Sequence, residues 1–292
     1  MISIITPTFN RAYILKNAYI SLQNQTSQQF EWIIVDDGST DDTQELVQKW
    51  QRENNLFEII YFKQENGGKH RALNNAVQHA KYDYTLILDS DDELIADAVY
   101  HIHVWIDHIK ELSGFAGVAG LRGWKQRNGV VGDNNFKAEY VDATNLQRKK
   151  FHLTGDKAEV YKTELLKKYP FPEFEGEKFL SESAVWNKIA ADGYKIRWFN
   201  KIIYRCDYLE DGLTKNSGVA MNLKNFQGFT YCVKLDIKLY PFLIKYFKIG
   251  YYKFVARQAG KNNKEICTLL NINKIQLALG AIVYRIKMFL KR

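Results

Sequence analysis

Leu86-Ile87-Leu88-Asp89-Ser90-Asp91-Asp92-Glu93 joins an apolar run directly to a cluster of acids. The residues from Tyr84 to Leu88 predict a buried strand, because aliphatic and β-branched side chains follow one another without polar alternation. The acids then stand at the carboxyl end of a strand, where open α/β sheets bind ligands. Carboxylates this close raise one another's pKa unless a hard divalent ion such as Mg²⁺ or Mn²⁺ neutralises them. The plainer interpretation is a solvated turn in which Asp92 caps a helix beginning at Ala96.

The same succession of strand, polar turn and helix precedes this stretch three times. The predicted strands are Ile2–Ile5, Phe30–Val35 and Phe57–Phe62, each followed by a stretch with helical apolar spacing. This alternation is typical of an α/β fold with a mostly parallel sheet flanked by helices, in which every strand delivers polar residues to the same edge. The residues expected in one crevice at that edge are Asn10, Asp37, Lys69 and Asp91.

A glycine-rich phosphate loop is missing from the sequence. Neither GxGxxG nor GxxxxGK[ST] occurs, which argues against an ordinary dinucleotide or ATP site. Lys69 and Arg71 stand near the start of a predicted helix and could still face a phosphate. The alternative for Gly67-Gly68-Lys69 is a simple loop before that helix.

Roughly the first hundred residues contain three motifs: Ile4-Ile5-Thr6-Pro7-Thr8-Phe9-Asn10, Val35-Asp36-Asp37-Gly38-Ser39-Thr40-Asp41 and Leu88-Asp89-Ser90-Asp91-Asp92. In order and spacing they resemble the motifs of family 2 inverting glycosyltransferases with the GT-A fold. The resemblance implies a GT-A type sheet with a Rossmann-like nucleotide-binding half, an NDP-sugar donor that is most often a UDP-sugar, and inversion at the anomeric carbon.

The resemblance also implies the site residues. The loop after the first strand and the acid matching Asp37 would hold the base of the nucleotide, and the acids matching Asp91 and Asp92 would touch the ribose and bind Mn²⁺ or Mg²⁺ at the diphosphate. The expected nucleotide-sugar-binding residues are Thr6, Pro7, Thr8, Asn10, Asp36, Asp37, Lys69, Arg71, Asp89, Ser90 and Asp91. The expected metal ligands are Asp91 and Asp92.

A catalytic base is expected at the start of the helix over residues 184–191. The family places a Glu-Asp pair there, with the Asp as base, whereas this chain has Glu182-Ser183. Either Glu182 takes the role or the correspondence shifts by one residue. We expect Glu182 to be the base because the helix start fixes its backbone, whereas the stretch from Glu173 to Glu177 is expected to be too mobile. The alternative is that Glu182 only stabilises the helix end.

The middle of the chain is less informative. His101, His103 and His108, in a helix predicted over Val99–Leu112, are expected to be surface or packing residues. Strands are predicted over Phe115–Leu121, Lys195–Phe199 and Ile202–Cys206, and a short helix over Thr163–Tyr169. The loop Tyr208–Thr214 is either a cover for the diphosphate or a plain turn, and residues 122–150 are expected to form a variable surface.

The positive charge belongs to the end of the chain. Net charge is +8, but residues 241–292 hold eleven Lys and Arg against Glu265 alone, which leaves the first 240 residues at −2. Residues 275–290 are fewer than the ~20 that a membrane span requires and include Arg285 and Lys287. Apolar residues in this stretch recur at helical spacing: Ile275, Leu279, Ile282, Ile286 and Phe289. With the aromatic and basic run from Tyr240 to Arg257, they suit an interfacial helix pair on an anionic membrane or a helical cap on the catalytic domain. No nucleic-acid-binding module accompanies the basic surface, so nucleic acid is not expected as a partner.

The sequence therefore predicts a catalytic domain over residues 1–218, with a nucleotide-sugar-binding half over 1–112 and an acceptor-binding half over 113–218. A helical basic and aromatic extension is expected over 219–292. The expected function is metal-dependent transfer of a single sugar to an acceptor hydroxyl in bacterial-type cell-surface polysaccharide or lipid-linked glycan synthesis. The scattered cysteines and the absence of a signal peptide suggest a cytoplasmic protein, peripheral on the inner face of the membrane.

Two other functions remain open from the sequence. A catalytically silent nucleotide-sugar-binding subunit would keep Asp37 and Asp91 and do without a base, and Ser183 favours it. A nucleotidyltransferase on a similar fold would need a Gly-rich, Arg-bearing loop after the first strand, and Thr6-Pro7-Thr8-Phe9-Asn10 is not such a loop.

Overall fold

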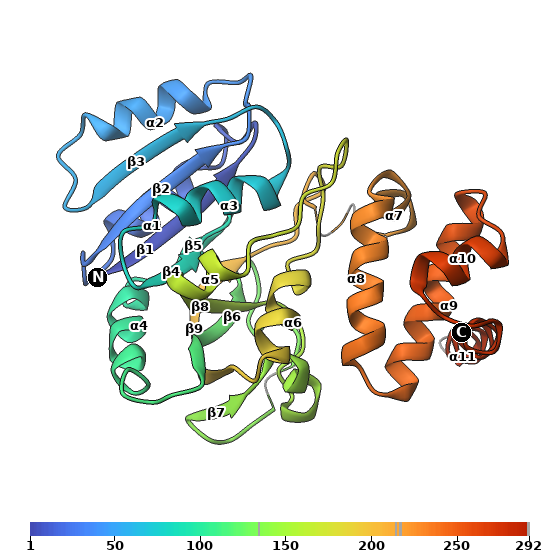
Figure 1. The fold of residues 1–292 in the computed structure, drawn as a ribbon. Coiled ribbons are helices and arrows are strands. Elements are labelled where there is room, and N and C mark those ends of the chain that lie inside the picture. The colour runs from blue at the N-terminus through green and yellow to red at the C-terminus, as the bar shows by residue number, and fades with distance from the viewer. Residues whose placement is uncertain (134, 214, 216–217, 291–292) are drawn as a thin grey trace. The chain divides into compact units, whose positions relative to one another are not determined.

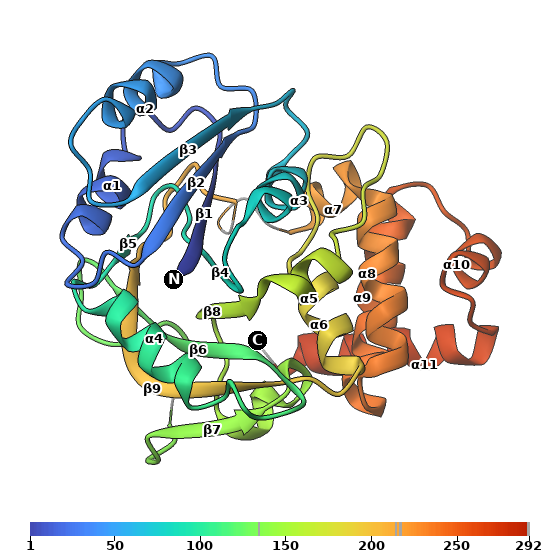
Figure 2. The ribbon, with the colours of Figure 1, turned by 60° about the vertical axis from the view of Figure 1, so that its left-hand side comes forward.

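The structure is a computed structural model that describes residues 1–292 except 134, 214, 216–217 and 291–292 (Figures 1 and 2). Contacts between residues divide the chain into two compact units. The first unit comprises residues 1–171 and 188–207, and the second comprises residues 172–187 and 208–292. Residues 172–187, expected in the catalytic domain, thus pack with the C-terminal helices in the second unit.

The first half of the sheet in the first unit is parallel. Its strands are β1 (Ile2–Thr8), β2 (Phe30–Asp36), β3 (Glu58–Lys63) and β4 (Tyr84–Ile87), in the order β3-β2-β1-β4. Helices α1 (Lys16–Gln23) and α2 (Thr43–Gln51) cover one face and α3 (Lys69–His79) the other (Figure 2). Every residue of β1 and β2 is buried, because both faces of these strands are covered. The predicted alternation of strands and helices is confirmed.

The second half of the sheet is mixed. It continues from β4 in the order β8-β6-β9-β5, and β7 also pairs with β9. Strand β8 runs antiparallel to both β4 and β6, whereas β9 runs parallel to β6. The bounds of these strands are β5 (Glu93–Leu94), β6 (Phe115–Trp124), β7 (Tyr140–Ala143), β8 (Lys157–Lys162) and β9 (Lys195–Cys206). The other elements of the unit are α4 (Ala98–Asp107), the 3₁₀ helix η1 (Asn145–Phe151) and α5 (Thr163–Lys168).

Two local predictions were wrong. The helix after the acids begins at Ala98 with Asp97 as its N-cap residue, so Asp92 does not cap it. The cause is β5, because Glu93 and Leu94 pair with Arg205 and Tyr204 of β9. Residues 195–206 form one strand and not two, and the polar pair at 200–201 lies within it.

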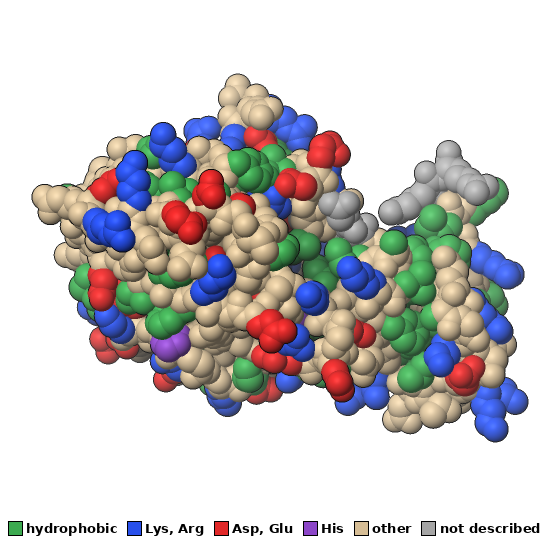
Figure 3. Space-filling view, turned by 90° about the horizontal axis from the view of Figure 1, so that it is seen from above, with side chains coloured by type: hydrophobic (Ala, Val, Ile, Leu, Met, Phe, Trp, Pro, Cys, Tyr) green, Lys and Arg blue, Asp and Glu red, His purple; other side chains and the backbone are tan. Residues whose placement is uncertain are grey.

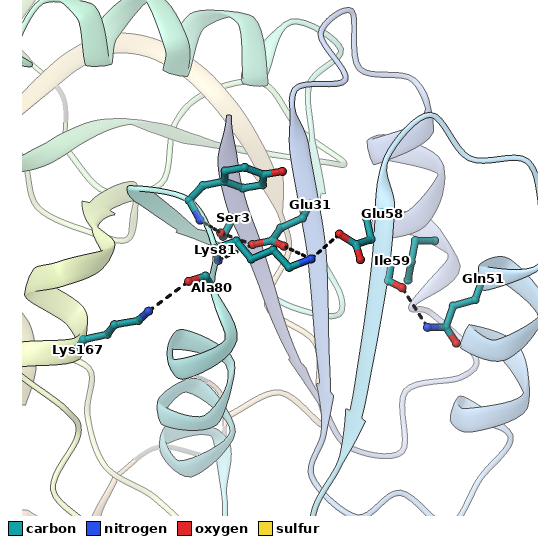
Figure 4. A network of polar contacts seen from close by, with 9 residues as sticks. Ser3, Glu31, Gln51, Glu58, Ile59, Ala80, Lys81 and Lys167 are labelled. Carbon is teal, nitrogen blue, oxygen red and sulfur yellow. Dashed lines mark hydrogen bonds and ion pairs between the residues drawn. The ribbon is translucent and has the colours of Figure 1, made fainter.

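A polar network stabilises the amino ends of these strands (Figure 4). The carboxylate of Glu31, 1% exposed, accepts hydrogen bonds from the Ser3 hydroxyl at 2.6 Å and the Lys81 backbone N–H at 2.8 Å. The Lys81 side chain extends to Glu58, at 2.7 Å. This network joins β1, β2 and β3 to Lys81, in the turn between α3 and β4, at the edge of the sheet opposite the acids.

The second unit is helical. Helices α8 (Phe226–Leu239), α9 (Phe242–Gln258), α10 (Asn263–Leu270) and α11 (Lys274–Phe289) pack around an apolar core that includes Ile249 and Tyr252. The short helix α7 (Val219–Lys224) contacts α8 and α9. Helices α9 and α11 approach closely at Gly250 and Gly280, since a Cβ atom on Gly250 would lie 2.1 Å from the Gly280 carbonyl oxygen.

Helix α11 has two different faces. Leu277 and Gly280 are buried against the core of the unit, whereas Ile275, Ile282 and Ile286 are 71%, 53% and 55% exposed. Among the described residues no single helix is long and apolar enough to cross a membrane. Only α10 and α11 taken together, bent by 99°, have sufficient length and apolar composition.

Candidate active site

The acid turn, residues Asp89 to Asp92, leaves the carboxyl end of β4 beside the ends of β1 and β2. Backbone hydrogen bonds fix this arrangement, because Leu88 donates to Ile5 at 3.0 Å and Asp37 donates to Thr8 at 2.8 Å. The three sequence motifs therefore meet at one edge of the sheet, as the parallel topology requires.

Asp89 is held by two cations. Its carboxylate lies 2.6 Å from Lys69 Nζ and 3.3 Å from Arg122 Nη1. Burial favours the neutral acid, but the charges of Lys69 and Arg122 outweigh it and lower the pKa of Asp89 to about 2. Lys69 thus does reach the predicted site, where it pairs with an acid.

Arg122 is a site residue that the sequence reasoning missed. Its guanidinium, 12% exposed, also lies 3.5 Å from Asp92, donates through Nε to the Lys157 carbonyl at 2.9 Å and stacks 4.1 Å from the centre of the Tyr204 ring. The Tyr204 hydroxyl in turn accepts the backbone N–H of Asp89 at 2.9 Å. Arg122 therefore connects β6, β8 and β9 to the acid turn.

Lys125 fixes the same turn from one residue beyond β6. Its Nζ atom donates to the Asp91 carbonyl and to Glu93 Oε1, both at 2.7 Å. The sequence placed Arg122 and Lys125 in a weakly patterned surface segment. Their spacing of three residues at the end of a predicted strand was the signal available.

The acids fit a divalent cation whose remaining ligands come from a substrate. Burial and the Asp89 carboxylate raise the pKa of Asp91, and they raise that of Asp92 well above its usual range. Asp92 Oδ1 is buried and has no hydrogen-bond partner in the described part of the chain. No group of three or more His, Cys, Asp or Glu side chains among those residues could hold a metal alone. Mg²⁺ sites commonly combine one or two carboxylates with substrate phosphates, and Asp91 and Asp92 supply such a pair.

Two predicted nucleotide ligands have internal roles in the sheet. Thr6 Oγ1 accepts the indole N–H of Trp32 at 2.9 Å, and both residues are buried. Asp36 accepts the Ser39 N–H at 2.7 Å and the Tyr61 hydroxyl at 2.6 Å. These contacts shape the loop after β2, and contact with a nucleotide stays a prediction for both.

Asn10 joins the loops that follow β1 and β2. Its backbone has a positive φ of 52°, which Asn tolerates better than most residues. Its Oδ1 accepts the Thr40 N–H at 2.8 Å, and its own N–H donates to Ser39 Oγ at 2.8 Å. The buried Thr8 hydroxyl beside it lacks a hydrogen-bond partner within the described residues.

Asp37 is 3% exposed and holds the loop over residues 64–68. Its carboxylate accepts the N–H groups of Gly67 and Gly68 at 2.8 and 2.7 Å. The side-chain amides of Gln64 and Asn66 donate to it at 2.8 and 3.2 Å. Four donors match the roughly four lone-pair positions of a carboxylate, so a nucleotide base would have to share or displace one of them.

The remaining predicted ligands surround these residues. Arg71 packs on Gly67 and donates to its carbonyl at 3.4 Å. Ser90 is buried within the acid turn, and Pro7 is buried in β1.

Glu182 belongs to the second unit and directly precedes α6 (Ser183–Ala191). Its carbonyl accepts the N–H groups of Val185 and Trp186 at 3.0 and 3.2 Å, and its side chain is half-buried. The expectation that the preceding stretch is too mobile was wrong at Glu177. That carboxylate, 7% exposed, accepts the N–H groups of Gln227 and Gly228 at the start of α8, at 2.6 and 2.8 Å. The base role of Glu182 stays a prediction.

One predicted loop is described only in part. The loop Tyr208–Thr214 ends at Thr214, which lies outside the described residues. The three cysteines Cys206, Cys232 and Cys267 are free thiols.

Comparison with known proteins gives a consistent result. The profile described as Glycosyl transferase family 2 matches residues 3–168. The chain is 30% identical over 224 residues to the GalNAc(5)-diNAcBac-PP-undecaprenol beta-1,3-glucosyltransferase of Campylobacter jejuni. This alignment covers 74% of this chain and 69% of that protein. The chain is also 33% identical to poly-beta-1,6-N-acetyl-D-glucosamine synthase of Staphylococcus aureus, over 41% of this chain but only 29% of that protein.

Solved structures extend the likeness to almost the whole chain. TarS residues 1–349 from S. aureus, in complex with UDP-GlcNAc, superpose with a TM-score of 0.63 at 19% identity, over 97% of this chain and 79% of that one. The mannosyltransferase PcManGT from Pyrobaculum calidifontis, in complex with GDP-Man and Mn²⁺, gives a TM-score of 0.57 at 17% identity, over 97% and 86%. The predicted fold class is confirmed by these structures.

Proposed function

The chain belongs to glycosyl transferase family 2, and on this premise we propose that it transfers a single sugar from a UDP-sugar to an acceptor hydroxyl, with inversion at the anomeric carbon. The observation that carries the proposal is the acid turn after β4. Asp91 and Asp92 stand in this turn beside the loops that match the family's nucleotide motifs, and the buried Asp92 Oδ1 has no hydrogen-bond partner among the described residues. A UDP-sugar donor is supported by the TarS complexes with UDP and UDP-GlcNAc, whereas the PcManGT neighbour binds GDP-Man.

In the proposed reaction Asp91 and Asp92 would hold Mn²⁺ or Mg²⁺, with the donor diphosphate supplying further ligands. The bound cation would offset the negative charge that builds up on the departing nucleotide diphosphate. Lys69, 2.6 Å from Asp89, can turn from that acid to a phosphate oxygen. Arg122 and Lys125 keep the acid turn in place while this exchange occurs.

The acceptor hydroxyl loses its proton to Glu182 in this proposal. A base on the side of the sugar opposite the leaving group gives direct displacement and inversion. Glu182 directly precedes α6, and its backbone is fixed there because its carbonyl accepts the N–H groups of Val185 and Trp186.

The proposed acceptor is a lipid-linked glycan at a membrane surface. The Campylobacter relative is named for an undecaprenol-linked acceptor. In this chain α11 exposes Ile275, Ile282 and Ile286 on one face, and the last 52 residues carry ten net positive charges. An amphipathic basic helix of this kind binds at the surface of anionic membranes. We propose that the protein acts at the cytoplasmic face of the membrane, in synthesis of a cell-surface polysaccharide or lipid-linked glycan.

The test is a screen of NDP-sugars for hydrolysis without acceptor, in Mn²⁺ and in EDTA. We expect UDP to be released only when the cation is present. In the Asp91→Asn variant the rate of release should fall by a factor on the order of 10² or more. Asp83→Asn is the matched control, because it makes the same change just before β4, at the other end of that strand. If the chain binds UDP-sugars but never turns them over, with or without glycan acceptors, it is the silent subunit and the proposal fails.

A further inference from the structure

We propose that a basic hollow in the second unit binds the diphosphate group of a lipid-linked acceptor. This inference rests on the proposed function and adds a ligand site to it. The hollow, of about 540 Å³, lies among α9, α10 and α11. It is lined by Lys253, Arg257, Asn262, Asn263, Lys264, Lys274, Leu277 and Ala278.

Four cations from three helices line this hollow. Lys253 and Arg257 come from the last part of α9, Lys264 from α10 and Lys274 from the start of α11. None of the four forms an ion pair with a carboxylate in the part of the chain that the structure describes. They repel one another, so an anion with several acceptor oxygens would stabilise the cluster.

The negative charge of Glu265 does not neutralise these four cations. Glu265 is the one acid after residue 240, and it pairs with Lys261 at 3.4 Å and accepts the Asn262 N–H at 2.8 Å. Arg257 donates to the neutral Asn263 amide oxygen at 2.7 Å. The charge of the hollow therefore remains positive, which suits a diphosphate.

The neighbouring surface identifies the ligand as a lipid. Lys274 is the first residue of α11 and is followed by exposed Ile275, and Ile282 and Ile286 continue the same face. Figure 3 shows hydrophobic side chains beside Lys and Arg on the surface of the C-terminal helices. A soluble phosphate compound would gain nothing from these apolar side chains, whereas the hydrocarbon chain of a lipid would bury them.

The hollow and the loop from Glu177 to Glu182 belong to the same unit. Lys253 follows Tyr252, whose ring lies 5.6 Å from that of Phe226 and whose hydroxyl lies 2.8 Å from Thr230 Oγ1 in α8. The first N–H groups of α8 hold Glu177 in the loop that leads to Glu182. A lipid diphosphate held in the hollow would thus be fixed to the unit that carries the proposed base.

The test uses the full chain and the double variant Lys253→Gln/Lys274→Gln. Its matched control is Lys234→Gln/Lys238→Gln, which removes the same charge from exposed positions on α8 outside the hollow. Binding is measured to neutral phosphatidylcholine vesicles containing undecaprenyl diphosphate and to vesicles of equal charge made with phosphatidylglycerol. Binding of soluble pyrophosphate is measured by calorimetry, and UDP-sugar hydrolysis without acceptor is measured for every variant.

We expect the hollow variant to bind diphosphate-lipid vesicles about tenfold or more weakly than wild type. The control variant should bind them like wild type, and both variants should bind phosphatidylglycerol vesicles equally. Loss of pyrophosphate binding in the hollow variant alone would support recognition of the diphosphate itself.

Equal weakening in both variants would overturn the proposal, because net charge would then account for binding. Selective weakening of the hollow variant on both kinds of vesicle would also overturn it, since the hollow would then bind any lipid phosphate. Donor hydrolysis separates the two proposals. If wild type hydrolyses UDP-sugars and the vesicle result is negative, only the hollow is wrong, whereas absent hydrolysis refutes the proposed function.

Discussion

Replacing Arg122 by Met should destabilise the first unit strongly in the absence of a divalent cation. The guanidinium lies 3.3 Å from Asp89 and 3.5 Å from Asp92, and its side chain is only 12% exposed. At an effective dielectric constant of ~20, a pair of unit charges this close attracts by about 5 kcal/mol before desolvation is subtracted. Removing one partner of a buried ion pair typically costs about 3–5 kcal/mol, because the other charge stays buried without compensation.

We expect Arg122→Met to lower the free energy of unfolding by about 3–5 kcal/mol, measured by urea denaturation in EDTA. Mn²⁺ with UDP should restore part of this loss, since a bound cation supplies positive charge to the same acids. The control is Arg127→Met. Arg127 is exposed and stacks on Trp124 at 4.0 Å, so its loss should cost about 1 kcal/mol or less.

An Arg122→Met variant as stable as wild type in EDTA would refute this reasoning. The acid turn would then tolerate its buried charges without Arg122, and the positioning role assigned to that residue would be wrong. If Mn²⁺ and UDP stabilised wild type and Arg122→Met equally, the cation would not be replacing the missing guanidinium.

Four other changes test separate parts of the structure. Asp37→Ala should weaken UDP binding, measured by calorimetry. It should also lower the free energy of unfolding in urea by about 3 kcal/mol or more, because buried N–H donors lose their acceptor. Unchanged stability would contradict the role of Asp37 in the loop. Burial lowers the pKa of Lys157 to about 8 from 10.5, so the unfolded chain binds more protons between these values and stability should rise with pH there. In the Lys157→Met variant the urea midpoint should rise less with pH over this range. An unchanged dependence of the midpoint on pH would contradict the role given to Lys157. Gly250→Ala should destabilise the helical unit by about 1–3 kcal/mol in thermal unfolding, since its Cβ atom meets the Gly280 carbonyl. Ile282→Asp should release the chain from anionic vesicles in sedimentation while donor hydrolysis persists, and retained binding would argue against a membrane face on α11.

The parallel half of the sheet could be predicted because its signals are local. Unbroken apolar runs mark buried strands, and the polar turns after them fall at one edge by topology alone. The two faces of α11 also follow from helical spacing, since Ile282 and Ile286 are exposed where the pattern is amphipathic. The dense packing at Leu277 and Gly280 was not foreseen, because it depends on the close approach of α9.

The partners of the acid turn could not be predicted, because they come from distant parts of the chain. Arg122 and Lys125 lie about thirty residues after the acid turn in the sequence. They reach the turn only because β6 pairs with β8 and β9. Strand β5 has two residues, too few for any periodicity, yet it moves the start of the next helix to Ala98. The saturation of the Asp37 carboxylate likewise depends on how the loop over 64–68 folds back.

The most direct test of the central claim is calorimetric titration of UDP into the wild-type chain, once in Mn²⁺ and once in EDTA. The acid turn is proposed to bind the nucleotide diphosphate through a cation held by Asp91 and Asp92, so UDP should bind at least about tenfold more tightly in Mn²⁺. Asp91→Asn should remove that difference. Equal affinity for UDP in Mn²⁺ and in EDTA would contradict metal-assisted glycosyl transfer at this site.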